Sequence, residues 1–409
     1  MTNTTNPTIE LENQYGAKNY APMPVVLTKG QGVYVWDDAG NRYLDMMSAY
    51  SAVSHGHCHP TLVKVLQQQA ERLTIVSRSF YTDQLGPFLK KACELTGFER
   101  ALPMNTGAEA VETALKAARK WAYTVKGVPH DQAEIIACKG NFHGRTITII
   151  GLSTEPQYQA GFGPFPPGLK TIPYGEPAEL EKAITKNTAA FLVEPLKGEG
   201  GIILPPDGYL KECAAICKKH NVLLICDEIQ TGLGRTGKLL AFQHEDMKPD
   251  AIVLGKALGG GLIPVSLFLT SKEVMDVFTP GDHGSTFGGN PLAASVASAA
   301  LDVLIEEKLI EKAASMGDYF LKSLKNIHSP IIKEVRGKGL LIGVEVKEGY
   351  SARDICLKLL VHGILCKETH RTVMRFAPPL MVTKEQIDTA VNALKQVFEE
   401  MEKQPAALK

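Results

Sequence analysis

Short apolar runs alternate with helical patterns through the middle of the chain. The runs are rich in β-branched residues and end at glycine or turn residues, which predicts buried strands. The strands are expected at 135–137, 146–150, 190–193, 223–226, 252–254 and 266–269. Alternation of this kind is typical of an α/β layer structure with a mainly parallel sheet.

Helical patterns and a hairpin flank this region. Helices are expected over 60–78, 106–126, 292–307 and 384–402. An Asp-Ala-Gly-Asn turn between two apolar runs predicts a hairpin over 32–45. Beyond about residue 310 the pattern changes to helix, strand (340–346) and helix, while residues 1–17 are expected to be loosely ordered.

The length and these patterns predict two domains. The chain has 409 residues, long enough for more than one hydrophobic core. We expect a large domain over 51–305 and a smaller α+β domain over 306–409. The N-terminal segment and hairpin, 1–50, are expected to pack with the smaller domain.

Charge and composition exclude several classes of partner. The chain carries 44 Lys plus Arg and 44 Asp plus Glu, so its formal net charge is zero. This balance argues against nucleic acid or an anionic membrane surface as the main partner. The 8 cysteines form no CxxC pair, and no apolar run reaches the length of a membrane span. The polar start of the chain resembles neither a signal nor a transit peptide, so a cytoplasmic protein is expected.

One carboxylate and one amine follow two of the predicted strands. Asp227 ends the run at 223–226, and Lys256 follows the run at 252–254. Ligands of parallel sheets bind at the carboxyl ends of the strands, so both side chains are candidates for one site. Pyridoxal phosphate requires such a pair, because a lysine binds its aldehyde and an acid keeps its pyridine nitrogen protonated. Alone, a lysine after a strand is usually a solvated loop residue, and an aspartate after a strand is usually a turn or cap residue.

Three further motifs are compatible with such a site. Thr106-Gly107-Ala108 begins a predicted helix, where free N–H groups favour an anion. In the loop 142–145, Phe142 can stack on a ring and Arg145 can bind a carboxylate in bidentate fashion. The hydroxyls of Ser285 and Thr286 can bind a phosphate. Taken singly, these residues are also consistent with an ordinary helix cap, a packing side chain, a surface arginine and a loop.

Two other motifs are discounted. The histidine-rich segment 55–59 does not have the spacing of common zinc sites, so no metal is expected. The glycines of 255–261 do not fit GxGxxG, which argues against a dinucleotide.

In combination, these motifs resemble the class III, fold-type I aminotransferases. The resemblance covers nearly the whole chain, from about residue 15 to 401, and is carried by DEIQTGLGRTG (227–237), GKALGGG (255–261), HGSTFGGNP (283–291) and RGKGLL (336–341). It implies the fold of a pyridoxal phosphate-dependent transferase: an α/β fold with a large domain built on a mainly parallel seven-stranded sheet, plus a smaller α+β domain.

The resemblance also implies the residues of the cofactor site. Lys256 would bind the cofactor and move the proton, and Asp227 would pair with the pyridine nitrogen. Phe142 would stack on the ring, and Thr286 of the partner subunit would reach the phosphate, so the site would need a homodimer. The full set of implied cofactor-binding residues is Thr106, Gly107, Ala108, Phe142, Glu194, Asp227, Ile229, Gln230, Lys256, Ser285 and Thr286.

Within the family, the chain most resembles those members that transfer the δ-amino group of ornithine to 2-oxoglutarate. This resemblance is carried by the segments 19–25, 46–60 and 375–380. Arg145 would then hold the α-carboxylate of ornithine, and Tyr20 and Tyr50 would shape its pocket. Arg375 would hold the α-carboxylate of 2-oxoglutarate, and Glu199 would mask Arg375 while ornithine reacts.

Alternatives remain open at this point. The sequence of the loop 142–145 is equally typical of relatives that act on acetylornithine. Tyr50 argues against such a substrate, because those relatives lack an aromatic residue at this position. Acetylornithine and 4-aminobutyrate are therefore alternative substrates. A mutase, or a pyridoxal phosphate protein without transaminase activity, is the more distant alternative.

Overall fold

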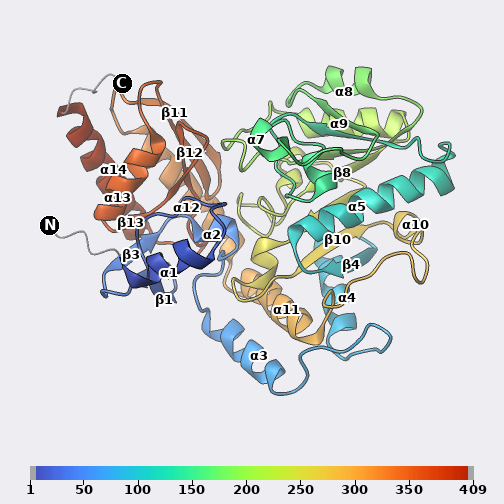
Figure 1. The fold of residues 1–409 in the computed structure, drawn as a ribbon, viewed down its shortest axis with the longest axis horizontal. Helices are drawn as coiled ribbons and strands as arrows, with labels where there is room; N and C mark the ends of the chain where they lie inside the picture. Colours follow the sequence, from blue (N-terminus) through green and yellow to red (C-terminus); the bar gives the residue numbers. More distant parts are fainter. Residues whose placement is uncertain (1–5, 404–409) are drawn as a thin grey trace.

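A seven-stranded sheet is the centre of this computed structural model, which describes residues 6–403 (Figure 1). Residues 1–5 and 404–409, which belong to the expected N- and C-terminal parts, lie outside this range. The strand order is β4-β10-β9-β8-β7-β5-β6. The strands are β4 (Arg100–Met104), β5 (Glu134–Cys138), β6 (Leu169–Ile172), β7 (Thr188–Val193), β8 (Leu223–Asp227), β9 (Ala251–Leu254) and β10 (Ser266–Thr270). Only β10 runs antiparallel to its neighbours, so the carboxyl ends of β5, β7, β8 and β9 meet at one edge.

The central strands are apolar throughout because both faces of the sheet are covered. In β8, Leu223 and Ile225 pack in one core with helix α5 (Gly107–Trp121), whereas Leu224 and Cys226 point into the core on the opposite face. All five residues of β8 are buried. This explains why the sequence shows a continuous apolar run rather than alternation.

Two smaller sheets lie together on the other side of the molecule (Figure 1). The N-terminal sheet contains β1 (Leu27–Gln31), β2 (Tyr34–Asp37), β3 (Arg42–Asp45) and β13 (Ile364–Leu365). The C-terminal sheet contains β11 (Ile332–Lys338), β12 (Leu341–Val346), β15 (Val373–Phe376) and β14 (Lys367–Thr369). Because β13 pairs in parallel with β3, the N-terminal hairpin is joined to the C-terminal part of the chain.

Helices cover the three sheets. The longer ones are α1 (Pro7–Tyr15), α3 (Pro60–Ala70), α4 (Leu85–Thr96), α5, α9 (Tyr209–Lys219), α11 (Pro291–Glu306), α12 (Leu309–Lys325), α13 (Ala352–Val361) and α14 (Lys384–Lys403). The short ones are α2 (Ser48–Ser51), α6 (Ile147–Ile150), α7 (Pro156–Gln159), α8 (Pro177–Ala183) and α10 (Lys272–Met275). No helix in the described part of the chain is long and apolar enough to cross a membrane.

Most of the predicted elements are present, and three predictions were wrong. The segment 146–150 is not a strand: Thr146 precedes helix α6, which packs against α5. Packing thus overrides the strand propensity of its β-branched residues. The helix predicted over 60–78 ends at Ala70, where the Gln69 side chain donates to the Leu73 carbonyl at 2.8 Å. Within 1–17, where no element was expected, residues 7–15 form α1, capped by Asn6.

Candidate active site

Asp227 and Lys256 lie at the same edge of the sheet and line the same cavity of about 200 Å³. Asp227 is the last residue of β8, and Lys256 follows β9 after Gly255. Lys256 adopts a left-handed backbone with φ of +45°, which directs the chain away from the strand. Burial lowers the pKa of the Lys256 ammonium from its ordinary value, which favours a neutral, reactive amine.

The buried Asp227 carboxylate is fixed by two hydrogen bonds. Its Oδ2 lies 2.7 Å from His143 Nδ1, and its Oδ1 accepts the Ile229 N–H at 3.1 Å. Burial alone would lower the pKa of His143, but the hydrogen bond and charge of Asp227 outweigh it, so the pKa is raised. An acid held in this way can keep a positive charge on a bound heterocycle.

The start of α5 forms one wall of the same cavity. Thr106 and Glu109 form a capping box, in which the Glu109 N–H and the Thr106 N–H each find a side-chain acceptor. The N–H groups of Gly107 and Ala108 have no carbonyl partner within the helix, since they belong to its first turn. Glycine at position 107 leaves room for the Ile229 side chain, because a Cβ atom there would stand 2.9 Å from Ile229 Cδ1. The wall therefore offers N–H donors and the positive end of the helix dipole to an anion.

Phe142 and Glu194 line the cavity beside His143. The Phe142 N–H donates to Glu194 Oε2 at 3.1 Å, and the Gly198 N–H donates to Glu194 Oε1 at 3.2 Å. Burial raises the pKa of Glu194 to about 7. Glu194 thus holds the backbone on either side of the cavity and helps to place the Phe142 ring.

The chemistry of these groups fits pyridoxal 5'-phosphate. The free N–H groups of the α5 start suit its phosphate, the Asp227 carboxylate suits its pyridine nitrogen, and the Lys256 amine suits its aldehyde. Phe142 offers an aromatic face to the ring. Gln230 and Ile229 complete the lining, and the Gln230 side chain also reaches the Tyr50 carbonyl at 3.5 Å.

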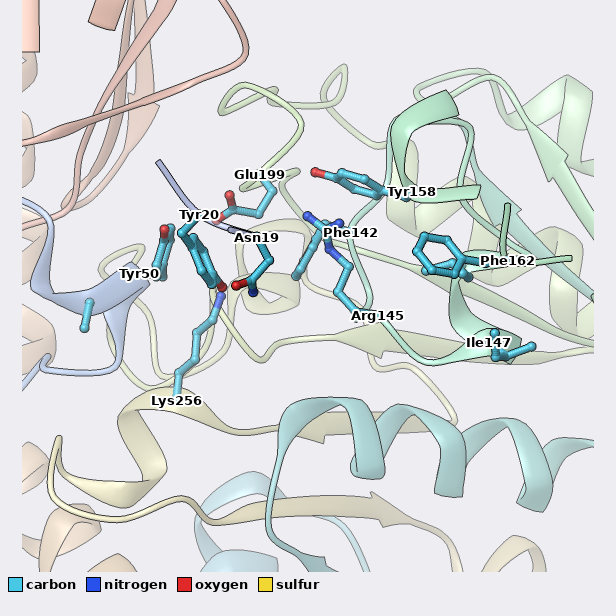
Figure 2. Close-up of a pocket in the computed structure, with 12 residues that line it drawn as sticks. Asn19, Tyr20, Tyr50, Phe142, Arg145, Ile147, Tyr158, Phe162, Glu199 and Lys256 are labelled. Carbon is cyan, nitrogen blue, oxygen red and sulfur yellow. The ribbon is translucent and has the colours of Figure 1, made fainter. Parts of the chain in front are cut away.

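A second cavity of about 470 Å³ opens above Lys256. Figure 2 shows Lys256 extending toward Tyr20 and Asn19, with Tyr50 on one side and Arg145 on the other. The Arg145 guanidinium carbon lies 3.4 Å from the centre of the Tyr158 ring and 5.5 Å from that of Phe142. The two rings hold this cation beside the cavity without neutralising its charge.

Arg375 and Glu199 form an ion pair at the edge of this second cavity. The Arg375 side chain is fully buried in β15, and its guanidinium carbon lies 4.7 Å from the centre of the Tyr50 ring. Within residues 6–403, neither Nε nor Nη2 of Arg375 has a hydrogen-bond partner. A buried guanidinium with unused donors is suited to bind a carboxylate that displaces Glu199.

Tyr50 sits in an unusual turn. Four successive residues, 48–51, have positive φ values between 44° and 74°. Asp45 accepts the N–H groups of Met47 and Ser48, each at 2.9 Å, and the Ser48 hydroxyl donates to the Ala377 carbonyl at 2.6 Å. These bonds hold a conformation that L-residues avoid and keep the Tyr50 ring over Arg375.

Two predicted residues lie away from the cavity of their own chain. The Ser285 hydroxyl accepts hydrogen bonds from the Asn105 side chain at 2.9 Å and from the Gly288 N–H at 3.0 Å. Thr286 is exposed, and neither residue lines either of the two cavities. Thr106 and Arg375 also line neither cavity, but Thr106 caps helix α5 and Arg375 pairs with Glu199. The other predicted residues line the two cavities that share Lys256.

His143 was missing from the predicted site residues. The sequence feature that could have identified His143 is its position next to Phe142, in a loop that follows a buried strand. The histidines of 55–59 have separate partners: His55 binds the Ala300 carbonyl, His57 binds Asp45 and His59 binds Glu307. Within residues 6–403, no group of three or more His, Cys, Asp or Glu side chains is arranged to hold a metal ion.

Comparisons with known proteins identify the family. The family model described as aminotransferase class-III matches residues 15–398. An ornithine aminotransferase of Geobacillus sp. is 58% identical over 96% of this chain and 98% of its own length. The crystal structure of the ornithine aminotransferase from Toxoplasma gondii superposes with a TM-score of 0.95 at 48% identity, covering 97% of this chain and 95% of that one.

An acetylornithine aminotransferase structure from Elizabethkingia anophelis is also similar, with a TM-score of 0.88 at 47% identity over 96% of this chain and 98% of that one. The family match spans both cavities and all three sheets. The chain therefore belongs to the class-III aminotransferases, fold-type I enzymes that use pyridoxal 5'-phosphate as their cofactor.

Proposed function

We propose that this enzyme transfers the δ-amino group of L-ornithine to 2-oxoglutarate. The products are glutamate and glutamate 5-semialdehyde, which cyclises to pyrroline-5-carboxylate. The observation that carries the proposal is the pair of arginines around Lys256: Arg145 is free of a carboxylate partner within residues 6–403, whereas Arg375 is paired with Glu199. The named activity of the 58% identical relative supports the same reaction.

The proposed cofactor residues follow from the first cavity. When bound, pyridoxal 5'-phosphate supplies the aldehyde that accepts the amino group and the ring that withdraws electrons from the substrate carbon. Asp227 keeps the ring nitrogen protonated, and Phe142 covers one face of the ring. The N–H groups of Gly107 and Ala108 bind the phosphate.

Lys256 has two roles in this proposal. It binds the cofactor, and its Nζ then carries the proton that leaves the amine-bearing carbon of the substrate. Burial lowers its pKa, which gives a larger fraction of the neutral amine that this proton transfer needs.

Selection of the δ-amine depends on the second cavity. Arg145 binds the α-carboxylate of ornithine at a distance from Lys256, which leaves the δ-amine near the cofactor. Tyr20 and Tyr50 flank the space between them. Glu199 masks Arg375 during this half-reaction, and it releases Arg375 when the α-carboxylate of 2-oxoglutarate enters.

We further propose that the enzyme is a homodimer with shared sites. Thr286 is exposed and lies outside the cavities of its own chain. It is therefore free to reach the phosphate of the cofactor bound in the partner subunit. Ser285 supports this loop through Asn105, the residue that precedes the α5 cap. The proposed domains are 51–305 and 306–409, with 1–50 attached to the latter, and the pairing of β3 with β13 supports that attachment.

Acetylornithine and 4-aminobutyrate are the competing donors, and the similarity to an acetylornithine aminotransferase makes the former the stronger alternative. Tyr50 favours ornithine, because its ring lines the second cavity together with Arg145 and fills space there that an acetyl group would need. The test is to measure kcat/KM for ornithine, acetylornithine and 4-aminobutyrate with 2-oxoglutarate as acceptor. A higher kcat/KM for either competitor would refute the proposed donor.

A further inference from the structure

The loop that carries Glu199 is a tight hairpin between β7 and α9. Lys197 and Ile203 exchange two backbone hydrogen bonds of 3.0 Å each, which closes the hairpin. Its tip has φ values of +108° at Gly201 and +53° at Ile202. The backbone of this loop therefore has a defined geometry.

Three carbonyls of the loop are bound by side chains of the C-terminal sheet. Arg336 Nη2 donates to the Gly201 carbonyl at 2.7 Å, and Arg336 Nε donates to the Ile202 carbonyl at 2.9 Å. The Thr369 hydroxyl donates to the carbonyl of Glu199 itself. The tip is thus held by the sheet that also contains Arg375, the ion-pair partner of Glu199.

Arg336 is itself rigidly held. Its Nη1 donates to Glu334 at 2.7 Å and also to Glu345, and only 11% of its side chain is exposed. A guanidinium whose charge is balanced on one side can present its remaining N–H groups in a fixed direction. The two carboxylates therefore orient Arg336 toward the loop.

We propose that Arg336, assisted by Thr369, is a positioning residue that sets the contact between Glu199 and Arg375 and thereby the choice of amino donor. This inference rests on the proposed function, in which Glu199 masks Arg375. Arg336 touches neither substrate nor cofactor. Its effect passes through the backbone of 199–202, because that backbone determines where the Glu199 carboxylate can reach.

The consequence for donor choice follows from the ion pair. With the backbone anchored, Glu199 can leave Arg375 for an incoming 2-oxoglutarate and return by side-chain rotation alone. Without the anchor, the loop has more conformations and Glu199 contacts Arg375 in fewer of them. Arg375 would then attract the α-carboxylate of α-amino acids, so that glutamate would gain as a donor relative to ornithine.

The chain offers a matched control for Arg336. Lys333 lies on the same strand and pairs with the same Glu345 at 2.6 Å, but it makes no hydrogen bond to the loop in the described structure. Arg336→Met and Lys333→Met therefore each remove one positive charge next to Glu345. Only Arg336→Met removes the two bonds to the loop carbonyls.

The experiment compares kcat/KM for glutamate and for ornithine in the holoenzyme. Arg336→Met is expected to raise the glutamate-to-ornithine ratio about tenfold, the scale of one lost positioning contact, whereas Lys333→Met leaves it within about twofold of wild type. Adding Arg336→Met to Glu199→Ala should change the ratio no further, because both act through the same ion pair. An unchanged ratio in Arg336→Met, or an equal rise in Lys333→Met, would overturn the proposal.

A second measurement is independent of the substrate. Amide hydrogen exchange of the peptide containing 198–203 should be faster in Arg336→Met than in wild type and unchanged in Lys333→Met. If Arg336→Met does not fold, Thr369→Val and Arg336→Lys are compared in the same two assays. Unchanged exchange in the loop would refute the anchor, whereas a wild-type enzyme without ornithine activity would refute the proposed function and leave the anchor supported by the exchange result.

Discussion

His143 Nδ1 lies 2.7 Å from Asp227 Oδ2, and both buried residues line the cavity that Lys256 also lines. The other carboxylate oxygen of Asp227 is held by the Ile229 N–H. These two contacts therefore fix the orientation of the Asp227 carboxyl group before any ligand is bound. Such preorganisation is the main protein contribution to catalysis at a charged centre.

Asp227→Asn should preserve the fold and greatly reduce turnover. An amide of the same shape fills the same space, but it cannot keep the ring nitrogen of the cofactor protonated. Loss of a charged hydrogen bond costs about 1.5–3 kcal/mol, so kcat should fall on the order of tenfold to hundredfold or more. The measurement is kcat with ornithine alongside the thermal unfolding midpoint. Turnover near that of wild type would exclude the proposed pairing with the ring nitrogen.

Lys256→Ala should abolish covalent attachment of the cofactor to the protein. In wild type, borohydride reduction followed by peptide mapping should place the cofactor on Lys256, because no other lysine lines the first cavity among residues 6–403. In the variant, reduction should leave no labelled lysine, and activity should be lost. The same labelled peptide in both proteins would show that another lysine binds the cofactor.

The sequence alone predicts those parts of the site that follow from local patterns, but not the contacts between segments that are distant in the sequence. Asp227 and Lys256 were predictable, because continuous apolar runs mark buried strands and parallel strands bring their carboxyl ends to one edge. The pairing of Glu199 with Arg375 was implied only by resemblance. Those residues come from a loop and a strand of different sheets, and no local pattern determines that they meet.

Two strands and one helix of the fold were likewise not predictable from local sequence patterns. Strand β4 contains Pro103, which weakens its strand signal and is tolerated because β4 lies at an edge of the sheet. Strand β6, at the opposite edge, is only partly buried and lacks a long apolar run. The 146–150 segment has strand propensity but packs as helix α6, which only the tertiary structure decides.

Glu228→Gln should stabilise the protein at high pH. Glu228 is buried, which raises its pKa to about 7, and it accepts hydrogen bonds from the Phe242 N–H at 2.9 Å and from Thr231. Because the folded pKa lies above the unfolded value, the folded state binds the proton more tightly, and stability falls as pH rises from about 4.5 to about 7. A glutamine can keep both contacts without this loss, because its amide oxygen can accept the Phe242 N–H while its amide NH2 donates to the Thr231 hydroxyl.

The expected difference in unfolding free energy between Glu228→Gln and wild type is up to about 3 kcal/mol above pH 7. It should shrink toward zero near pH 4.5. Denaturant unfolding at pH 5 and at pH 8 measures it. A difference that is the same at both pH values would show that Glu228 does not titrate in this range.

Thr286 should act across the dimer interface. Lys256→Ala and Thr286→Ala are each expected to impair activity in the pure variant. If Thr286 serves the partner's site, a hybrid dimer contains one site with both residues intact, so mixing should restore part of the activity. Subunit exchange must be verified with differently tagged chains. Exchange without recovery would argue against a shared site.

Donor choice should respond to both Glu199 and Tyr50, by different routes. Glu199→Ala leaves the buried Arg375 without its ion-pair partner, so Arg375 should attract the α-carboxylate of glutamate and raise its use relative to ornithine. Tyr50→Ile removes the ring that lies 4.7 Å from Arg375 and opens space beside it. It should therefore reduce the use of ornithine and improve that of acetylornithine or 4-aminobutyrate.

Each of these two substitutions changes about one buried polar contact. A change of ten- to hundredfold in preference is expected, on the order of 1.4–3 kcal/mol. The measurement is kcat/KM for ornithine, glutamate, acetylornithine and 4-aminobutyrate in both variants. The two routes predict different patterns. Glu199→Ala should favour the α-amino acid glutamate, whereas Tyr50→Ile should favour a donor whose α-amine is acetylated, as in acetylornithine, or missing, as in 4-aminobutyrate. Unchanged ratios in both variants would refute the roles of Glu199 and Tyr50, while the assignments of Lys256 and Asp227 would stand, because those depend on the first cavity alone.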